Sequence, residues 1–332
     1  MIPIKGYATF HPLKHCLLGS GFKAEWFDRL YKDDKILSPL KRIADETEED
    51  FIKLEEILKK FNVITYRAKL EIDSYETIGK FYRPPITPRD HFGVIGEKFY
   101  AVQHAQGYSN ILKNIAKENL FLRPKDQNYS GTIDTAHIVR VGKDLFWGYD
   151  PTQGDASEYI NIWKNEGFRV NLVERKYHSD AVFCVVKPGC IVSLEDIQDY
   201  NKNFPSWEIF TIKDKDIVTG LGKKFDSMKS KVKGRWWLKG EEHNDQLIEF
   251  VNTWLSEWVG YVEETVFDVN MLSLDENTII CNNYNKEVFD FFKKHRVEPV
   301  VFNFRHRYFW DSGVHCVTQD LYREGKMEDY LN

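Results

Sequence analysis

The sequence has no long apolar run, few cysteines and no excess of basic residues. No stretch approaches the roughly 18 to 20 apolar residues that a membrane-spanning helix requires, so we expect no membrane partner. The first six residues lack the apolar core of a signal peptide and the Arg-rich character of a transit peptide. These absences predict a cytoplasmic protein.

The cysteines resemble neither a disulfide framework nor a metal site. Their number is odd and their spacing is wide, and no CxxC pair or His/Cys cluster has metal-ligand spacing. We therefore expect a reducing compartment, one working thiol and otherwise buried, small hydrophobic cysteines. The five are Cys16, Cys184, Cys190, Cys281 and Cys316.

The formal charge of −5 argues against a nucleic-acid footprint, which would need clustered Lys and Arg. The richest basic run, residues 223–235, is short and is interrupted by Asp226, which favours a solvated loop over a phosphate-binding patch. The 332 residues, 42% hydrophobic and 15% aromatic, suit a large core and a well-packed globular enzyme. Nothing resembles a flexible linker, so we predict a single domain over residues 1–332.

Several segments repeat one local order: an amphipathic helix, a brief polar turn and a β-rich strand. They are residues 51–66, 159–173, 194–212, 246–262 and 287–304. Thr47 and Asp50 resemble a capping pair before the first helix. With an extra strand beside some of these helices, the order predicts an α/β protein of repeated ββαβ units. An ordinary α/β protein with alternating elements explains the order about equally well.

Residues 67–157 break this pattern. Pro84, Pro85 and Pro88 predict an extended arm, and residues 127–131 predict a loop. We interpret the region as an insertion that contributes to the wall of an active site.

Polar side chains in β-rich surroundings suggest one chemistry. Cys316 offers a thiol, and His178 and Asp180 would share one face of an extended segment because they are two residues apart. A guanidinium group is planar and cationic, so carboxylates such as Asp90, Asp134 and Asp180 are its natural clamp. Its carbon is open to a thiolate, and His178 is a suitable base and acid. Gly313 would leave room for close approach of backbone or substrate.

Each of these residues also has an ordinary structural interpretation. A cysteine in an apolar stretch is usually a buried hydrophobe, and a His-x-Asp pair is often a surface pair. Asp134 suits a turn, and Asp90 suits an ion pair with Arg89. Spacing alone leaves these alternatives open.

The order of these segments resembles the amidinotransferases of the pentein superfamily, such as glycine amidinotransferase. Residues 88–90 resemble the family's A-R-D, residues 133–144 its F-D-A-A-D-F-I-R-x-G-K-D, and residues 178–183 its H-I-D-A-T-F. Residues 270–276 resemble its N-V-L-M-L-D-E, and residues 313–316 its G-F-H-C. The resemblance runs nearly from end to end in the family's order.

The resemblance implies a five-bladed α/β propeller, the pentein fold, and an enzyme without metal or organic cofactor. It implies that Cys316 is the nucleophile and forms an amidino-cysteine, that His178 is the general acid and base, and that Asp134 supports His178. Asp90 and Asp180 would bind the guanidinium group. Its small-molecule substrates would be arginine, which leaves as ornithine, and an acceptor amine. Because relatives are often dimers, a homodimer is one expected assembly.

Departures from the family's pattern affect the acceptor. The family's Gly-Gly-Gly is residues 311–313 here, which adds Asp311, and the Asp closing D-A-A-D is His137. Residues 193–197 lack the arginine that binds a substrate carboxylate, and Glu263 and Glu264 replace small hydroxyl residues. These changes favour a cationic, polyamine-like acceptor over glycine.

Other functions remain as alternatives. An arginine deiminase-like hydrolase would use water as acceptor. Such enzymes typically have the pattern E-G-G-D at the position of Asp134, whereas residues 134–136 of this chain resemble the transferases. A non-catalytic binding protein on this fold, such as a ribosome anti-association factor, would lack the nucleophile. A cysteine protease would have no use for the extra carboxylates.

Overall fold

The structure is a computed structural model that describes residues 1–28, 32–69, 76–77, 80–81, 83–101, 107–122, 135–149, 157–174, 178–194, 199–212, 238–255 and 267–331. Asp134 lies outside these ranges, as do Glu263, Glu264, the loop at 127–131 and the basic run at 223–235.

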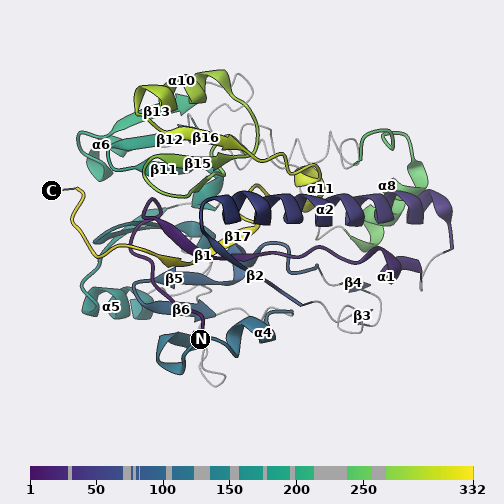
Figure 1. Cartoon of the computed structure of the whole chain (residues 1–332), viewed down its shortest axis with the longest axis horizontal. Coiled ribbons are helices and arrows are strands. Elements are labelled where there is room, and N and C mark those ends of the chain that lie inside the picture. The colour runs from purple at the N-terminus through teal and green to yellow at the C-terminus, as the bar shows by residue number, and fades with distance from the viewer. Residues whose placement is uncertain are drawn as a thin grey trace.

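The helices are mostly short, with one exception of 27 residues. They are α1 (Ala24–Asp28), α2 (Asp34–Lys60), α3 (Pro88–His91), α4 (Ser109–Leu112), α5 (Ser157–Asn165), α6 (Tyr200–Asn203), α8 (Asp245–Trp254), α10 (Lys286–Lys294) and α11 (Arg307–Trp310), with the 3₁₀ turns η2 (Lys117–Asn119), η3 (Thr135–His137) and η5 (Ser179–Ala181). In Figure 1 the long α2 crosses the molecule, with α8 near one of its ends.

The strands are also short. They are β1 (Leu13–Leu18), β2 (Ile64–Arg67), β3 (Glu76–Thr77), β4 (Lys80–Phe81), β5 (Gly93–Ile95), β6 (Lys98–Ala101), β7 (Leu120–Leu122), β8 (Ile138–Val141), β9 (Asp144–Tyr149), β10 (Arg169–Glu174), β11 (Phe183–Lys187), β12 (Cys190–Leu194), β13 (Glu208–Ile212), β14 (Leu272–Ser273), β15 (Thr278–Cys281), β16 (Glu298–Val301) and β17 (Thr318–Arg323).

Apart from the β3–β4 pair, the strands form three-stranded sheets that share one pairing pattern. The orders are β17-β1-β2, β5-β6-β7, β8-β9-β10, β11-β12-β13 and β14-β15-β16. In each sheet the middle strand is antiparallel to one neighbour and parallel to the other. A helical segment connects the two parallel strands, as parallel pairing requires. An α/β protein with small sheets is therefore confirmed, whereas the arrangement of these sheets as a propeller stays a prediction.

The region 67–157 contains regular structure that its sequence did not suggest. The sheet β5-β6-β7 lies within it, and β8 and β9 follow. Gly96, with φ of +60°, makes the tight turn between β5 and β6. The strands are three and four residues long, too short for a periodicity to be recognised. The expected insertion and the single-domain boundaries stay predictions.

The expected capping role of Thr47 and Asp50 is wrong, because both lie in the middle of α2 and are buried. The N-cap is Asp33, whose carboxylate accepts a hydrogen bond from Lys35 N at 3.0 Å. Thr47 Oγ1 instead accepts from Trp310 Nε1 at 2.9 Å, and Asp50 Oδ1 accepts from Arg305 Nε at 2.8 Å. The two side chains tie α2 to the segment that leads to Cys316.

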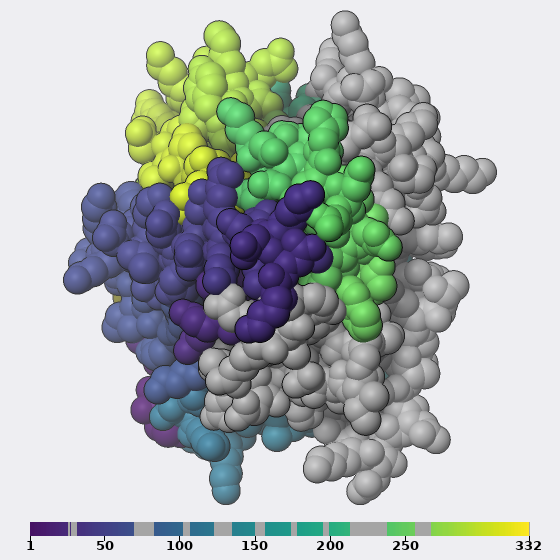
Figure 2. All heavy atoms as spheres, turned by 90° about the vertical axis from the view of Figure 1, so that its right-hand side faces the viewer, coloured from purple at the N-terminus to yellow at the C-terminus, as the bar shows by residue number. Residues whose placement is uncertain are grey.

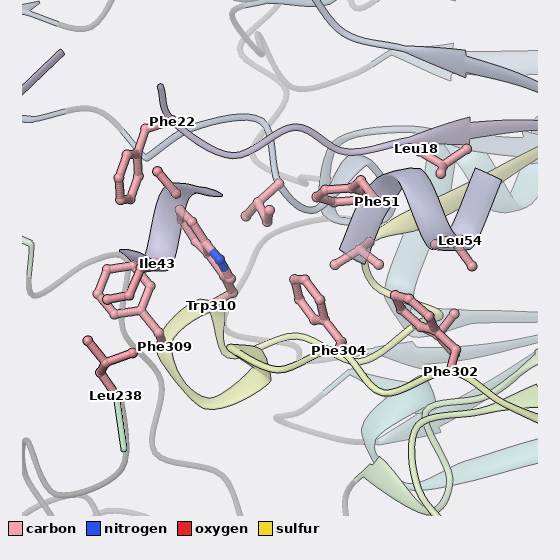
Figure 3. Close-up of a cluster of buried hydrophobic side chains, with 14 of the residues drawn as sticks. Leu18, Phe22, Ile43, Phe51, Leu54, Leu238, Phe302, Phe304, Phe309 and Trp310 are labelled. Carbon is pink, nitrogen blue, oxygen red and sulfur yellow. The ribbon is translucent and has the colours of Figure 1, made fainter. Parts of the chain in front are cut away.

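Apolar packing strengthens this connection. Figure 3 shows Phe304, Phe309 and Trp310 lying against side chains of α2 and the segment after β1. The rings of Phe51 and Phe304 are 5.8 Å apart, and those of Phe22 and Trp310 are 5.5 Å apart. Burial of each such ring contributes about 1.5–3 kcal/mol. The approach to the Cys316 turn is therefore anchored in the largest hydrophobic cluster described.

Hydrogen bonds hold the N-terminal part of α2 against residues 238–255. Figure 2 shows the chain near the start of α2 beside residues 238–255. Asn244 Nδ2 donates to Lys35 O at 2.7 Å, and Arg42 Nη1 donates to Lys239 O at 3.2 Å. Within the described ranges, no helix combines the length and apolar character needed to cross a membrane.

Candidate active site

Cys316 lies in the turn between α11 and β17. Its side chain is surrounded by polar groups: Asn270 Nδ2 donates to Sγ at 3.0 Å, and Sγ lies 3.5 Å from Asp180 Oδ2. The residue as a whole is 9% exposed. Cys16, Cys184, Cys190 and Cys281 are also buried and form no disulfide.

Two asparagines hold the Cys316 turn by its backbone. Asn270 Oδ1 accepts from His315 N at 3.0 Å and from Cys316 N at 3.3 Å. Asn282 Oδ1 accepts from Val314 N at 2.7 Å. A Cβ at Gly313 would lie 2.3 Å from Asn270 Oδ1. The space left by Gly313 is therefore filled by Asn270, where the sequence had suggested backbone or substrate.

Asp180 and His315 form a buried pair beside the thiol, with His315 Nδ1 2.8 Å from Asp180 Oδ2. Burial alone would raise the pKa of Asp180, but the hydrogen bond from His315 and the charges of His178 and Arg89 lower it to about 2. Burial, helped by Arg89, lowers the pKa of His315 to about 4. At neutral pH the carboxylate is therefore ionised, and a neutral His315 donates its Nδ1 proton to it.

His178 approaches this group from the segment before η5. Its Nδ1 is 3.8 Å from Asp90 Oδ1, and its ring meets the His137 ring edge to face at 4.8 Å. The expected extended conformation is wrong, because Ser179–Ala181 form a 3₁₀ turn. Ser179 Oγ stabilises that turn by donating to His137 O at 2.8 Å. The strand periodicity therefore does not explain why His178 and Asp180 are close.

Arg89 and Asp90 turn to different partners, so the alternative in which they pair with each other is wrong. Arg89 Nη2 donates to Asp320 Oδ1 at 2.9 Å, and its Nε donates to His315 O at 2.8 Å. Asp90 is partly exposed and lies beside His178. One residue of this motif therefore supports the Cys316 turn from the core, while the next faces the site.

The surroundings of Cys316 disfavour its thiolate. Burial raises the pKa of the thiol well above its usual range, and the carboxylates of Asp180 and Asp90 raise it further. The amide of Asn270 acts in the opposite direction without compensating for them. The thiol is therefore protonated at neutral pH in this arrangement. A cation placed between the carboxylates would lower the pKa of the thiol.

The structure brings together the described members of the predicted site: Cys316, His178, Asp90 and Asp180. The role of Asp134 stays a prediction, since the described chain resumes at Thr135. Sequence reasoning missed Asn270 and His315, although both stand in motifs that resemble the family's. Within the described ranges, no group of three or more His, Cys, Asp or Glu side chains could hold a metal ion.

Two departures from the family pattern can be located. Asp311 ends α11 with φ of +52°, a left-handed conformation that Asp tolerates better than most residues. Ser193 is fully buried, and its Oγ donates to Leu194 O at 2.9 Å. Ser193 therefore cannot act as the missing clamp for a substrate carboxylate.

Comparison with known proteins gives a consistent result. No family model matches the chain. It is 21% identical over 209 residues to the L-arginine:L-lysine amidinotransferase of Pseudomonas savastanoi pv. phaseolicola, covering 61% of this chain and 48% of that protein. It is also 21% identical over 209 residues to the mitochondrial glycine amidinotransferase of Xenopus laevis, covering 60% of this chain and 40% of that one. The chain thus spans about half or less of the curated relatives it matches.

Solved structures extend the likeness over the whole chain. The amidinotransferase SxtG of Microseira wollei aligns with a TM-score of 0.71 at 18% identity, covering 99% of both chains. The inosamine-phosphate amidinotransferase StrB1 of Streptomyces griseus aligns with a TM-score of 0.70 at 15% identity, covering 100% of both. A dimethylarginine dimethylaminohydrolase aligns with a TM-score of 0.57 at 10% identity, covering 92% of this chain and 99% of that one. The resemblance to pentein amidinotransferases in sequence and fold is therefore confirmed.

Proposed function

We propose that the protein transfers an amidino group from L-arginine to an acceptor amine through an amidino-Cys316 intermediate. The observation that carries this proposal is a thiol 3.5 Å from an ionised, buried carboxylate whose other oxygen, Oδ1, finds no hydrogen-bond partner among the described residues. A nucleophile beside an unsatisfied anion suits an electrophile that is itself a cation.

Binding of the guanidinium group would prepare the thiol for attack. Asp180 Oδ1 would accept its N–H groups, with Asp90 on the side of His178. Because these carboxylates raise the pKa of Cys316, neutralising them with a cation lowers it. The substrate would thus generate its own nucleophile, and the free thiol would stay unreactive.

The first half-reaction would pass the S–H proton to His178 as the Cys316 sulfur bonds to the guanidinium carbon. The bond from that carbon to the side-chain nitrogen of arginine then breaks. His178 returns its proton to this nitrogen, and ornithine leaves as an amine. A cationic amidino group remains on sulfur. Asp134 would orient His178.

The second half-reaction would reverse these steps with a new amine. The neutral acceptor nitrogen attacks the amidino carbon and gives a proton to His178, and the carbon–sulfur bond breaks. Cys316 leaves as a thiolate and recovers the proton from His178. Donor and acceptor use one site in turn, which is a ping-pong scheme.

We propose a cationic amine as the acceptor. Ser193 cannot bind a carboxylate, and Asp311 adds negative charge to the segment before Cys316. The Pseudomonas relative is named for lysine, an acceptor with a second amino group. Activity that is equal with glycine and with diamines would contradict this part of the proposal.

We also propose that the repeated three-stranded sheets form the blades of a five-fold α/β propeller in a single domain over residues 1–332. Their common pairing pattern and the whole-chain alignment with amidinotransferases support this arrangement.

The test is to incubate the purified protein with arginine and, separately, glycine, lysine and a diamine. We expect ornithine, a new guanidino compound, and an amidino adduct on the Cys316 peptide in mass spectrometry when the acceptor is withheld. Cys316→Ala should abolish all three. Cys190→Ala is the matched control, since this buried cysteine at the start of β12 takes no part in the described hydrogen bonds of Asp180 and Asn270.

Each other outcome contradicts a named part of the proposal. Citrulline and ammonia in place of ornithine would mean that water is the acceptor, as in a hydrolase. Unchanged turnover by Cys316→Ala would exclude Cys316 as the nucleophile. No reaction with arginine would reject arginine as the donor.

A further inference from the structure

Asn270 occupies a central place beneath the Cys316 turn. It is 2% exposed, and its side chain uses its full hydrogen-bonding capacity. Oδ1 accepts from His315 N and Cys316 N, while Nδ2 donates to Asp180 O at 3.3 Å and to Cys316 Sγ at 3.0 Å. No other described side chain donates a hydrogen bond to this sulfur.

The orientation of the amide follows from its partners. Backbone N–H groups can only donate, so the atom facing His315 N and Cys316 N must be the oxygen. The carbonyl of Asp180 can only accept, so the atom facing it must be the nitrogen. The sulfur therefore faces an N–H, because a flipped amide would lose its hydrogen bonds with His315 N, Cys316 N and Asp180 O.

We infer that Asn270 is a catalytic residue that stabilises the Cys316 thiolate through its Nδ2–H group and fixes the direction of the sulfur. The inference rests on the proposed role of Cys316 as nucleophile. In the resting site the S–H group points to Asp180 Oδ2, and the Asn270 amide supports the sulfur from another side. Once a guanidinium occupies Asp180 and the S–H proton has left, the Asn270 contact remains.

The other groups around the sulfur cannot replace this donor. Asp180 and Asp90 are carboxylates and oppose the thiolate. His315 directs its Nδ1 proton to Asp180, and Arg89 donates to the His315 carbonyl. His178 lies against Asp90 and has to carry a proton in the proposed reaction. The backbone at Gly313 also favours the thiolate, and it lies in the same turn that Asn270 holds through His315 N and Cys316 N.

The test follows alkylation of Cys316 by iodoacetamide against pH, read by mass spectrometry of the Cys316 peptide. We expect Asn270→Ala to raise the midpoint of this profile by about one pH unit or more, since a hydrogen bond to a charged group changes an equilibrium by about ten- to hundredfold. Asn270→Asp keeps the shape and the oxygen contacts but removes the N–H, so it should raise the midpoint further.

Asn282→Ala is the matched control. Asn282 is equally buried and holds the same turn through Val314 N, but its Nδ2 donates to carbonyls of Phe267 and Asn270 and not to sulfur. An equal shift of the alkylation midpoint in Asn270→Ala and Asn282→Ala would mean that Asn270 only supports the loop. A midpoint that is unchanged in both Asn270 variants would overturn the inference.

The assay separates this inference from the proposed function, because labelling needs no amidino donor. Wild-type protein that is labelled at Cys316 but transfers no amidino group would reject the proposed function. If the enzyme transfers the amidino group and both Asn270 variants leave the midpoint of the alkylation profile unchanged, the inference alone is rejected.

Discussion

Two buried aspartates near the Cys316 turn have opposite surroundings. Asp320 accepts from Arg89 Nη2 at 2.9 Å and Arg323 Nε at 2.8 Å, and it also binds Arg140. These permanent cations overcome the effect of burial and hold the pKa of Asp320 well below its usual range. Asp180 has neutral partners in His315 and the thiol, and its Oδ1 finds none within the described ranges.

The difference separates a structural carboxylate from one prepared for a ligand. Asp320 is needed to compensate three buried guanidinium groups, which themselves bind backbone carbonyls such as His11 O and Val94 O. Within the described ranges no guanidinium or ammonium group is hydrogen-bonded to Asp180, so it retains affinity for a cation. Neutralising Asp320 should therefore mainly affect stability, and neutralising Asp180 should mainly affect the binding of a cation.

The largest expected effect is on stability. Asp320→Asn should lower the free energy of unfolding by about 3–5 kcal/mol, because it leaves buried guanidinium groups without their counter-charge. Asp144→Asn is the control: Arg169, its partner, is 34% exposed and also binds Asp329, so about 1 kcal/mol is expected. Urea denaturation measures both. Equal losses would show that the buried cluster is no more than an ordinary ion pair.

Asp180→Asn should mainly affect activity. We expect kcat/KM for the amidino donor to fall by about a hundredfold or more, since a desolvated charge pair with the substrate is lost. The free energy of unfolding should also fall, but only by roughly 2 kcal/mol, because a pKa of about 2 against the usual 3.8 means that the folded protein favours the carboxylate. Steady-state kinetics and urea denaturation of the same preparation measure both. A stability loss as large as that of Asp320→Asn would make Asp180 structural.

The pair around Asp180 also predicts a pH dependence. The pKa of His315 is about 4 in the folded protein, below its usual 6.5, so between these values only the unfolded chain binds the proton. This contribution to stability is present above pH 6.5 and is lost as the pH falls towards 4, by roughly 3 kcal/mol. Urea denaturation should show that the free energy of unfolding falls less between pH 7 and pH 4 in His315→Gln than in the wild-type protein.

His11 offers a control for this prediction. Burial, with Arg323, lowers its pKa to about 4 as well, but its Nε2 bonds to Tyr330 OH at 2.9 Å, not to Asp180. His11→Gln should also flatten the pH profile of stability while the enzyme stays active. If His315→Gln keeps the full fall in stability, the imidazole is charged in the folded protein and the description of the Asp180 pair is wrong.

The sequence predicted which polar residues lie together better than it predicted the elements around them. Cys316, His178, Asp90 and Asp180 were singled out because they suit a guanidinium substrate and because their segments resemble the amidinotransferases. The structure brings these residues together, while their roles stay predictions. The contacts of Asn270 and His315 were not predicted, because they depend on a turn whose shape no short-range sequence pattern specifies. Arg89 escaped because its partner Asp320 is 231 residues away.

Among the elements, the helices with a clear apolar face, α5, α8 and α10, begin within two residues of the starts of the predicted segments. The start of α2 was missed, because Pro39 lies inside it and Thr47 and Asp50 resembled a cap. Tertiary contacts with Trp310 and Arg305 decide the role of those two residues, and local sequence cannot show them.

The smallest expected effect concerns Ser179, which lies between His178 and Asp180 and donates to His137 O at 2.8 Å. Ser179→Ala removes one neutral, buried hydrogen bond, so the free energy of unfolding should fall by about 1 kcal/mol. Since the Asp180 charge is untouched, KM for the donor should change little, in contrast to Asp180→Asn. Urea denaturation and steady-state kinetics measure the two quantities. A large rise in KM would mean that the hydrogen bond of Ser179 and the 3₁₀ turn position the Asp180 carboxylate. Asp180 would then depend on its local structure as strongly as Asp320 depends on its arginines.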